Sequence, residues 1–249
     1  MDINKNNANK YSDICNKYND KYNNIDNLNA IKKFKNHPII CNLVDWNMLN
    51  KILKENNIRL IDFVGKGHRG VVFKGLMDDK LVAIKVPRLG AKNTIYHEGN
   101  ILKEINKFGV APIVYNFSED FLIMEFADGI TLKDYMNQND IDKKELLCII
   151  EETLRQCLRL DLHKIDHTEI QGGKHIIVNR NDNKNINKIY IIDFDKAKKR
   201  RAHNFTSAMA LFFGKCYMAN KVKEILNISE DEERYIMELV KLYKKIVLR

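Results

Sequence analysis

The chain has 249 residues, 45% of them hydrophobic, so it is long enough for one large domain or two small ones with a sizeable core. A wholly disordered protein is therefore excluded. Lys and Arg outnumber Asp and Glu by 42 to 33, and the resulting net charge of +9 favours acidic partners such as nucleotides, nucleic acid or anionic surfaces.

The cysteine pattern and the apolar runs indicate in which cellular compartment the protein is expected. The five cysteines are widely spaced and include no Cys-x-x-Cys pair, so we expect neither a disulfide framework nor a zinc cluster, and a reducing cytoplasm fits best. The sequence shows no secretory leader pattern and no apolar run of about 18 residues. We expect a cytoplasmic protein that does not span a membrane.

Residues 1–57 are predicted to form an N-terminal extension. Up to about residue 29 the composition is dominated by Asn, Lys, Tyr and Asp, which predicts disorder because few aliphatic residues can offset the entropy of ordering. This tail is either dispensable or an arm that contacts a partner. Between Cys41 and Glu55 apolar residues recur at helical spacing around Trp46, so a short helix is expected to pack the extension onto the domain.

Residues 58–127 are predicted to form a small antiparallel β lobe with one helix. The expected elements are strands at 58–64, 71–75 and 81–86, a helix around 101–105, and strands at 113–117 and 121–126. Residues 128–249 are predicted to form a mostly helical lobe, with an apolar stripe from Leu146 to Leu162 and two short strands, 176–178 and 189–192. The expected fold class is α+β, with two lobes and a cleft between them.

A glycine motif lies between the first two predicted strands. Gly65, Gly67 and Gly70 satisfy the pattern G-x-G-x-x-G-x-V. In a dinucleotide-binding fold a helix follows these glycines, but here the β-branched and aromatic residues 71–73 predict a strand. A glycine flap between two strands can instead lie over phosphates and donate backbone N–H groups to them.

A lysine follows in the middle of an apolar strand. Val82-Ala83-Ile84-Lys85 matches the pattern V-A-I-K. A strand lysine in apolar surroundings either extends its amine to solvent or meets an anion, and the phosphates of ATP together with a carboxylate would supply one. Lys85 is therefore a candidate phosphate-binding residue.

In this order the two motifs resemble those of the protein-kinase-like superfamily, and the resemblance covers about residues 58–197. It implies ATP bound at the β lobe by Gly65, Lys66, Gly67, Gly70, Val72, Ala83, Lys85, Met124, Glu125 and Ala127. Within residues 123–129, which resemble the hinge, Met124 would be the gatekeeper, while the Glu125 carbonyl and the Ala127 N–H would contact adenine.

The resemblance also implies a glutamate on the helix after Lys85 that pairs with it. At about 100° per residue, Glu98 shares the face of the apolar residues 101, 102 and 105, whereas Glu104 is turned away. Glu98 is therefore predicted to pair with Lys85, and Glu104 to be solvated.

The expected catalytic loop follows the long helix. His167-Thr168-Glu169-Ile170 is similar to the H-x-D-L core, with Glu169 in the place of the aspartate that positions the acceptor hydroxyl. Asp166 is the rival acid, which the loop register disfavours. His175 takes the place of the metal-binding asparagine, and imidazole is a poor ligand for Mg²⁺ that Mn²⁺ would accept. The alternative is a structural hydrogen bond from His175, and His163 is predicted to cap or pack.

Asp193-Phe194-Asp195 resembles the D-F-G motif, so Asp193 is predicted to hold Mg²⁺. Asp195 replaces the glycine of that motif, so a residue that easily adopts a left-handed conformation is lost there. The segment Asp-Phe-Asp also resembles the variant found in sugar and antibiotic kinases. Residues 196–201 form a basic run, either a solvated surface or a contact for an acidic substrate or RNA. Because no A-P-E follows, the chain resembles the small atypical archaeal Ser/Thr kinases, including the RIO group, which lack an activation segment.

These features predict an ATP-dependent phosphotransferase that uses Mg²⁺ or Mn²⁺ and transfers phosphate to a hydroxyl of a protein. Two alternative hypotheses stay open. In the first, the phosphate acceptor is a small molecule of the sugar or antibiotic type. In the second, the chain is a pseudokinase that binds ATP as a structural ligand.

Overall fold

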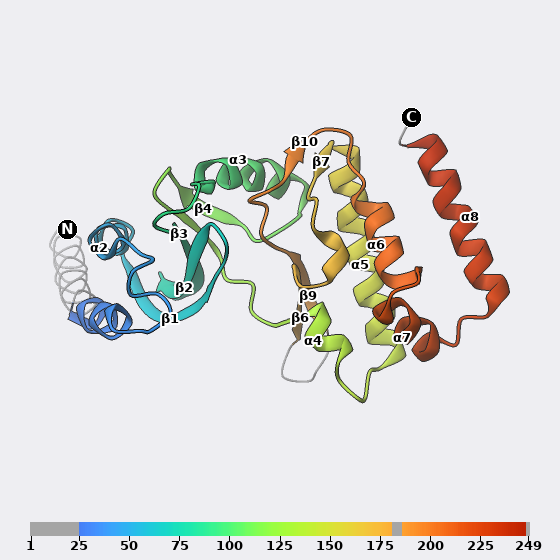
Figure 1. Cartoon of the computed structure of the whole chain (residues 1–249), viewed down its shortest axis with the longest axis horizontal. Coiled ribbons are helices and arrows are strands. Elements are labelled where there is room, and N and C mark those ends of the chain that lie inside the picture. Colours follow the sequence, from blue (N-terminus) through green and yellow to red (C-terminus); the bar gives the residue numbers. More distant parts are fainter. Residues whose placement is uncertain (1–24, 181–185, 248–249) are drawn as a thin grey trace, which may run out of the picture. The chain divides into compact units, whose positions relative to one another are not determined.

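The computed structural model describes residues 25–180 and 186–247, and the chain divides into two compact units (Figure 1). Unit 1 contains the residues up to 99 and residues 114–126, and unit 2 contains residues 100–113 and 127–249. Unit 1 is built around an antiparallel sheet and unit 2 is mostly helical, which confirms the predicted α+β class.

Unit 1 is based on a five-stranded antiparallel sheet in the order β1-β2-β3-β5-β4. Its strands are β1 (Ile58–Lys66), β2 (Gly70–Met77), β3 (Lys80–Pro87), β4 (Val114–Phe117) and β5 (Leu122–Glu125). Asp78 and Asp79 join β2 to β3 with φ of 45° and 60°, the left-handed pair that a tight hairpin turn requires. β3 pairs with both β2 and β5, so Lys85 lies on a strand with a neighbour on each side.

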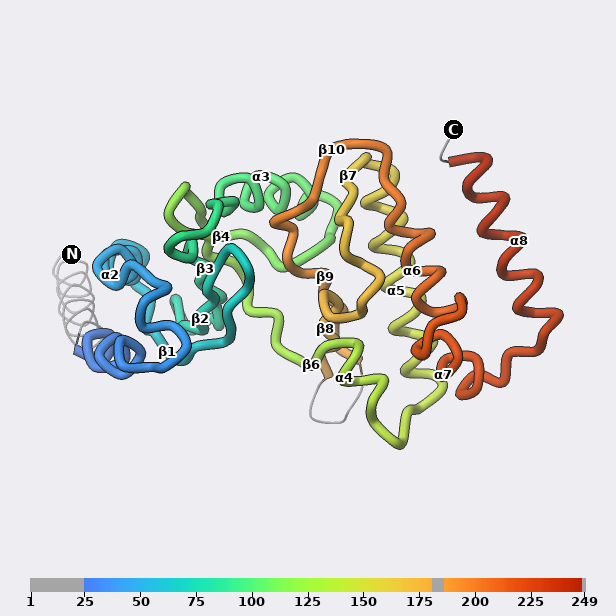
Figure 2. The backbone as a smooth tube through the Cα atoms, viewed as in Figure 1, coloured from blue at the N-terminus to red at the C-terminus, as the bar shows by residue number. Residues whose placement is uncertain are grey.

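Two helical segments pack on this sheet, residues 25–35 and α2 (Trp46–Glu55) (Figure 2). Phe34 and Leu49 join Phe73 of β2 in one buried core. α2 begins at Trp46 rather than at Cys41, because the Asp45 carboxylate accepts hydrogen bonds from the first free N–H groups of the helix. The Trp46 indole N–H donates to the Cys41 carbonyl at 2.9 Å, which holds the preceding turn against α2.

Part of the predicted disordered extension is helical. Residues 1–24 lie outside the described residues, but residues 25–29, which were also predicted to be disordered, belong to the helix at 25–35. Asn27 is buried there, and its amide donates to the Ile58 carbonyl and accepts from the Leu60 N–H, both at 2.7 Å. The prediction was wrong for these residues because a tertiary contact with β1, which composition does not reveal, stabilises the helix.

Helix α3 (Ile95–Ile105) begins in unit 1 and ends in unit 2. Within unit 1, a Cβ added to Gly99 would lie 2.3 Å from the Phe117 ring of β4. Only a glycine therefore allows α3 to approach the sheet this closely. The helix ends in a short 3-10 turn (Asn106–Phe108), followed by Gly109 with a φ of 69°.

Besides the end of α3 and two 3-10 turns, unit 2 contains five α-helices and two small sheets within the described residues. The helices are α4 (Leu132–Met136), α5 (Lys143–Leu162), α6 (Asn204–Phe213), α7 (Tyr217–Leu226) and α8 (Glu230–Ile246). One sheet has the order β6-β8-β9, with β6 (Ile130–Thr131), β8 (Ile176–Arg180) and β9 (Ile186–Ile191); the other pairs β7 (Ile165–Asp166) with β10 (Lys198–Lys199). The β7–β10 pair was not expected from the sequence, because two residues are too few for a strand pattern.

A buried carboxylate joins three helices of unit 2. Asp161, in the last turn of α5, accepts hydrogen bonds from the backbone and side chain of Asn204, from the Phe205 N–H and from the Tyr243 hydroxyl. The first two partners lie at the start of α6, and Tyr243 lies on α8.

In the described part of the chain, no helix is long and apolar enough to cross a bilayer.

Candidate active site

The glycine loop of unit 1 is a tight turn between β1 and β2. The Gly67 N–H donates to the Gly70 carbonyl at 2.8 Å. A Cβ added at Gly65 would meet nothing within 4 Å, and one at Gly67 would meet only the Gly70 carbonyl at 3.6 Å. These two glycines therefore leave space beside the loop, which a ligand could use to approach the backbone.

Gly70 has a different role, because it lies against Lys85 on the neighbouring strand. A Cβ at Gly70 would lie 3.0 Å from Cε of Lys85 and 3.2 Å from the Val86 carbonyl. Val72, half-buried, is the residue of β2 that pairs with Lys85. The absence of a side chain at Gly70 thus leaves room for the lysine side chain on β3, while Lys66 is exposed at the end of β1.

Lys85 forms a buried ion pair within unit 1. Its Nζ lies 2.7 Å from Oε2 of Glu98, and the two side chains are 9% and 0% exposed. Glu98 comes from the first turn of α3. A lysine and a glutamate are buried to this degree almost only when they are paired, because each charge loses its hydration. The structure thus brings together the two residues that were predicted to pair.

The predicted adenine-binding residues belong to both units. Met124 on β5 is buried and pairs across the sheet with Ala83 on β3. Glu125 is the last residue of β5. Ala127 is the first residue of unit 2 after the crossover, so the segment predicted to be the hinge is the point at which the chain passes between the units.

In unit 2 the predicted catalytic loop is anchored by His167. Its side chain is fully buried; Nε2 lies 2.9 Å from the Ile192 carbonyl, and Nδ1 accepts from the Glu169 N–H at 3.2 Å. Nε2 must therefore carry the proton and donate it to the carbonyl. Burial lowers the pKa of His167 to about 4, so the ring is neutral near pH 7. Its edge-on contact with Phe194, at 4.6 Å between centroids, links the loop to the Asp-Phe-Asp segment.

His175 lies between the two predicted functional carboxylates. Its Nε2 is 3.8 Å from Oε2 of Glu169, and its Nδ1 is 3.7 Å from Oδ2 of Asp193. Burial lowers the pKa of His175, against the opposing effect of Asp193 and Glu169. Nε2 is a buried atom with no hydrogen-bond partner in the described residues. The structure therefore brings Glu169, His175 and Asp193 together around one imidazole.

Asp193 adopts a left-handed conformation, with a φ of 66°. This conformation is strained for a residue other than glycine and often marks a functional position. Asp195, which replaces the glycine of the D-F-G pattern, does not have a positive φ, in line with the expected loss of an easy left-handed conformation at that position. The left-handed residue is the predicted metal ligand itself.

Glu169 is ion-paired with a residue of the basic run. Lys196 Nζ lies 2.9 Å from Oε1 of Glu169. Partial burial raises the pKa of Glu169, but the hydrogen bond and charge of Lys196, with the charges of His175 and Lys174, outweigh burial and hold that pKa below its usual value. Glu169 is therefore ionised near pH 7, the state in which a carboxylate can accept a proton. Sequence reasoning missed this role of Lys196.

The rest of the basic run is also largely paired within unit 2. Lys199 forms an ion pair with Glu104, and Nε of Arg200 donates to Asp166 at 2.7 Å. Glu104 was predicted to be solvated; its side chain is 32% exposed and forms the surface ion pair with Lys199, which the sequence did not predict. Asp166, the rival to Glu169 as the catalytic acid, is thus engaged in an ion pair with Arg200.

All five basic residues of the run are exposed, and three of them, Lys196, Lys199 and Arg200, are engaged in these ion pairs. The contact of residues 196–201 with RNA or an acidic partner stays a prediction, and three of its charges are shared with carboxylates of unit 2. His163, the C-cap of α5, stacks on Phe108 at 3.3 Å between ring centroids, as its predicted packing role requires.

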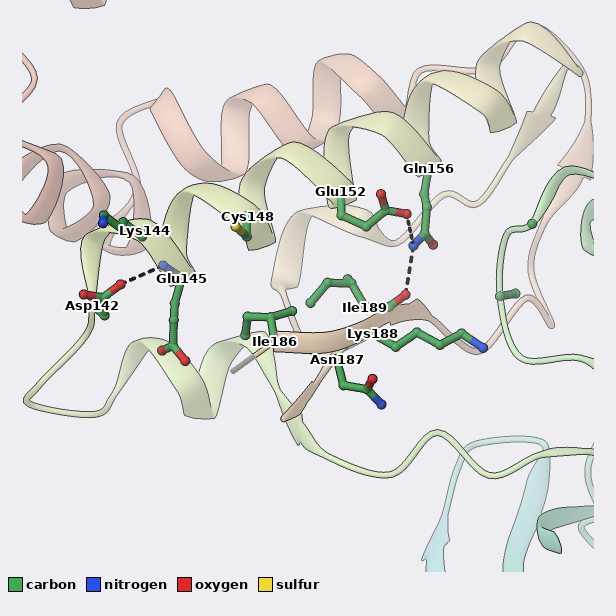
Figure 3. Close-up of a pocket in the computed structure, with 12 residues that line it drawn as sticks. Asp142, Lys144, Glu145, Cys148, Glu152, Gln156, Ile186, Asn187, Lys188 and Ile189 are labelled. Carbon is green, nitrogen blue, oxygen red and sulfur yellow. Dashed lines mark hydrogen bonds between the residues drawn. The ribbon is translucent and has the colours of Figure 1, made fainter. Parts of the chain in front are cut away.

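A pocket of about 580 Å³ in unit 2 contains none of the predicted site residues (Figure 3). It lies between α5 and β9. Figure 3 shows the Gln156 amide donating to Glu152 and to the Ile189 carbonyl across this pocket. Since none of the predicted catalytic, nucleotide-binding or metal-binding residues lines it, we assign this pocket no part in the predicted chemistry.

The fold is similar to that of a known kinase. The structure of the kinase domain of PF14_0431 matches with a TM-score of 0.51 and 20% identity, over 67% of this chain and 64% of that chain. No family model matches the sequence. The fold is therefore protein-kinase-like.

Two curated proteins are similar in sequence. The uncharacterized protein MJ1211 of Methanocaldococcus jannaschii is 47% identical over 124 residues, which are 49% of this chain and all of that protein. The chain therefore belongs to the same family as MJ1211. The probable serine/threonine-protein kinase PknB of Lactococcus lactis is 26% identical over 195 residues, which are 73% of this chain but only 30% of that protein.

Proposed function

We propose that the chain is an ATP-dependent kinase that transfers the γ-phosphate to a hydroxyl group, and that it is an atypical Ser/Thr kinase of the RIO-like kind without an activation segment. The observation that carries the proposal is the buried ion pair between Lys85 and Glu98, 2.7 Å apart, beside a glycine loop with open space at Gly65. The residues from 58 to 127 would form the nucleotide lobe and those from 128 to 249 the acceptor lobe.

In the nucleotide lobe, the backbone N–H groups of the glycine loop would bind the phosphates, with Lys66 beside them. Lys85 would bind the α- and β-phosphates, and Glu98 would fix the position of its amine. The side chains of Val72, Ala83 and Met124 would border the adenine ring, whose polar edge would contact the Glu125 carbonyl and the Ala127 N–H.

Asp193 would hold Mg²⁺, which neutralises charge on the phosphates when it is bound. The donor set fits this ion, because Mg²⁺ in phosphotransfer sites is usually held by one or two carboxylates together with phosphate oxygens. The Asp193 side chain is 35% exposed and can reach a ligand. His175, 3.7 Å from that carboxylate, adds a nitrogen that suits Mn²⁺ better than Mg²⁺.

Glu169 would act on the acceptor. Its ionised carboxylate would take the proton of the acceptor hydroxyl while that oxygen bonds to the γ-phosphorus and the bond from phosphorus to the β,γ-bridging oxygen breaks, which releases ADP. Lys196, 2.9 Å from Glu169, would keep the carboxylate oriented and ionised.

A second candidate function, that of a nucleotide-binding pseudokinase, is favoured by the ion pair between Lys196 and Glu169. The Lys196 ammonium already occupies one oxygen of Glu169, and histidine replaces the second metal-binding residue. Both features would slow turnover without weakening the phosphate-binding residues of unit 1.

Transfer from γ-labelled ATP tests the proposal. Wild type, Asp193→Ala, Lys85→Ala and the matched control Lys80→Ala, an exposed lysine on the same strand, are compared with Mg²⁺ and with Mn²⁺, in the presence of protein and small hydroxylated acceptors. The proposal expects metal-dependent label on an acceptor, retained in Lys80→Ala and lost in the other two variants. Label only on small molecules would contradict the Ser/Thr assignment, and ATP binding without transfer would identify the pseudokinase.

A further inference from the structure

Helix α8 uses only one of its faces within unit 2. Val240 is buried, and Tyr243 donates its hydroxyl to Asp161 at 2.8 Å and packs on Phe205 of α6. In the shared view of Figures 1 and 2, α6 and α7 lie on one side of α8, and none of the described helices or strands of unit 2 lies on the opposite side. The helix begins with a complete capping box, formed by Ser229 and Glu232, so its free face belongs to a well-formed helix.

The free face carries four large apolar side chains in one line. Tyr235, Leu239, Leu242 and Ile246 are 63%, 46%, 51% and 69% exposed. Their spacing of four, three and four residues is that of the seam of a coiled coil, and at about 100° per residue the four lie within one narrow stripe. Scattered exposed apolar residues are ordinary, but an aligned stripe of this kind marks an interaction surface. We call these four residues the α8 stripe.

The charges of α8 indicate which partner fits. The first turn carries four acidic residues, 230–233, whereas the last turn carries Lys244 and Lys245. Two such helices side by side in the same direction place acid beside acid and base beside base. In opposite directions each acidic end meets a basic end, and the helix dipoles also oppose each other favourably. A second copy of the same helix, related by a two-fold axis, is thus complementary to the first.

The residues that border the α8 stripe support the same pairing. Glu238 and Lys245 are both exposed and lie seven residues apart on the edge of the stripe that faces away from Val240. When Leu239 packs against Leu242 of a second copy in the opposite direction, Glu238 comes beside Lys245 of that copy, and the two-fold axis repeats the contact. The apolar seam and the charged border therefore specify one register.

We propose that two copies of this chain form a symmetric dimer through their α8 helices, packed in opposite directions along the α8 stripe. The pairing buries the apolar stripe of each copy and forms two intermolecular contacts between Glu238 and Lys245. It does not depend on the proposed kinase activity.

Sedimentation velocity of the full chain tests the dimer over a range of micromolar concentrations. The proposal expects a monomer–dimer equilibrium in the wild type and at least about a tenfold weaker dimer in Leu239→Gln and Leu242→Gln, because each change affects the interface twice. Met237→Gln is the matched control, since Met237 is 40% exposed on α8 but outside the stripe. Far-UV circular dichroism checks that α8 stays folded in each variant.

A charge swap tests the direction of the pairing. Glu238→Lys places two bases together at each border contact and should weaken the dimer, as should Lys245→Glu, whereas the double variant should restore the wild-type affinity. A monomer at every concentration would overturn the proposal. So would a dimer that the stripe variants leave unchanged, or a double variant weaker than both single variants.

Discussion

Acid should unfold this protein through His167. The ring is fully buried, donates from Nε2 to the Ile192 carbonyl and accepts at Nδ1 from the Glu169 N–H. A second proton on Nδ1 would have to break the latter bond and place a charge where water cannot hydrate it. Burial therefore lowers the pKa of His167 from 6.5 to about 4 in the folded chain.

The sign and the size of the effect follow from this difference. Between about pH 6.5 and pH 4 the unfolded chain binds a proton at His167 that the folded chain does not. The stabilisation is thus complete above pH 6.5 and is lost as the pH falls. About 2.5 pH units at about 1.4 kcal/mol each make the loss roughly 3 kcal/mol by pH 4. The lowered pKa of His175 acts in the same direction.

Urea denaturation followed by far-UV circular dichroism at several pH values between 7.5 and 4.5 measures the slope. Wild type should lose up to about 1.4 kcal/mol of unfolding free energy per pH unit through His167. His167→Gln, which keeps a donor for the Ile192 carbonyl, should show a shallower slope, whatever its stability at neutral pH. His203→Gln removes an exposed histidine and is the control. Equal slopes in wild type and His167→Gln would refute the reasoning.

Three further outcomes follow from unit 1. Glu98→Ala should lower the free energy of unfolding by about 3 to 5 kcal/mol, because it removes one partner of a buried ion pair, and in a double-mutant cycle with Lys85→Met the two losses should not add. Gly99→Ala should cost about 1 to 3 kcal/mol in the same urea assay, since the new Cβ would lie 2.3 Å from the Phe117 ring. Gly65→Ala should leave the urea midpoint unchanged, because its Cβ meets nothing within 4 Å, yet lower the ATP affinity measured by calorimetry.

Local patterns predicted most of the fold. The glycine loop, the apolar strand around Lys85 and the helix face shared by Glu98 each depend on neighbours within a few residues, and the structure brings Lys85 and Glu98 to 2.7 Å. The long stripe on α5 has the same local origin. The spacing of apolar residues along a helix or strand is enough to predict these features, because it determines which face is buried and therefore which side chains meet.

Long-range contacts were missed. The basic run gives no sign that Lys196 pairs with Glu169 or that Lys199 pairs with Glu104, since these partners are decided by the β7–β10 pairing and the fold of unit 2. The helix at residues 25–35 depends on Asn27 at the edge of β1, 31 and 33 residues away along the chain. The strain at Asp193 likewise depends on its surroundings and not on its residue type.

Calorimetric titration with ATP and with adenosine tests the central claim most directly, that Lys85 and the glycine loop form a phosphate-binding site. Wild type should bind ATP more tightly than adenosine. Lys85→Ala should weaken ATP binding by about tenfold or more, the size expected for a lost charge-assisted contact, and leave adenosine binding unchanged, while Lys80→Ala should match wild type. Equal ATP affinity in wild type and Lys85→Ala would contradict the account.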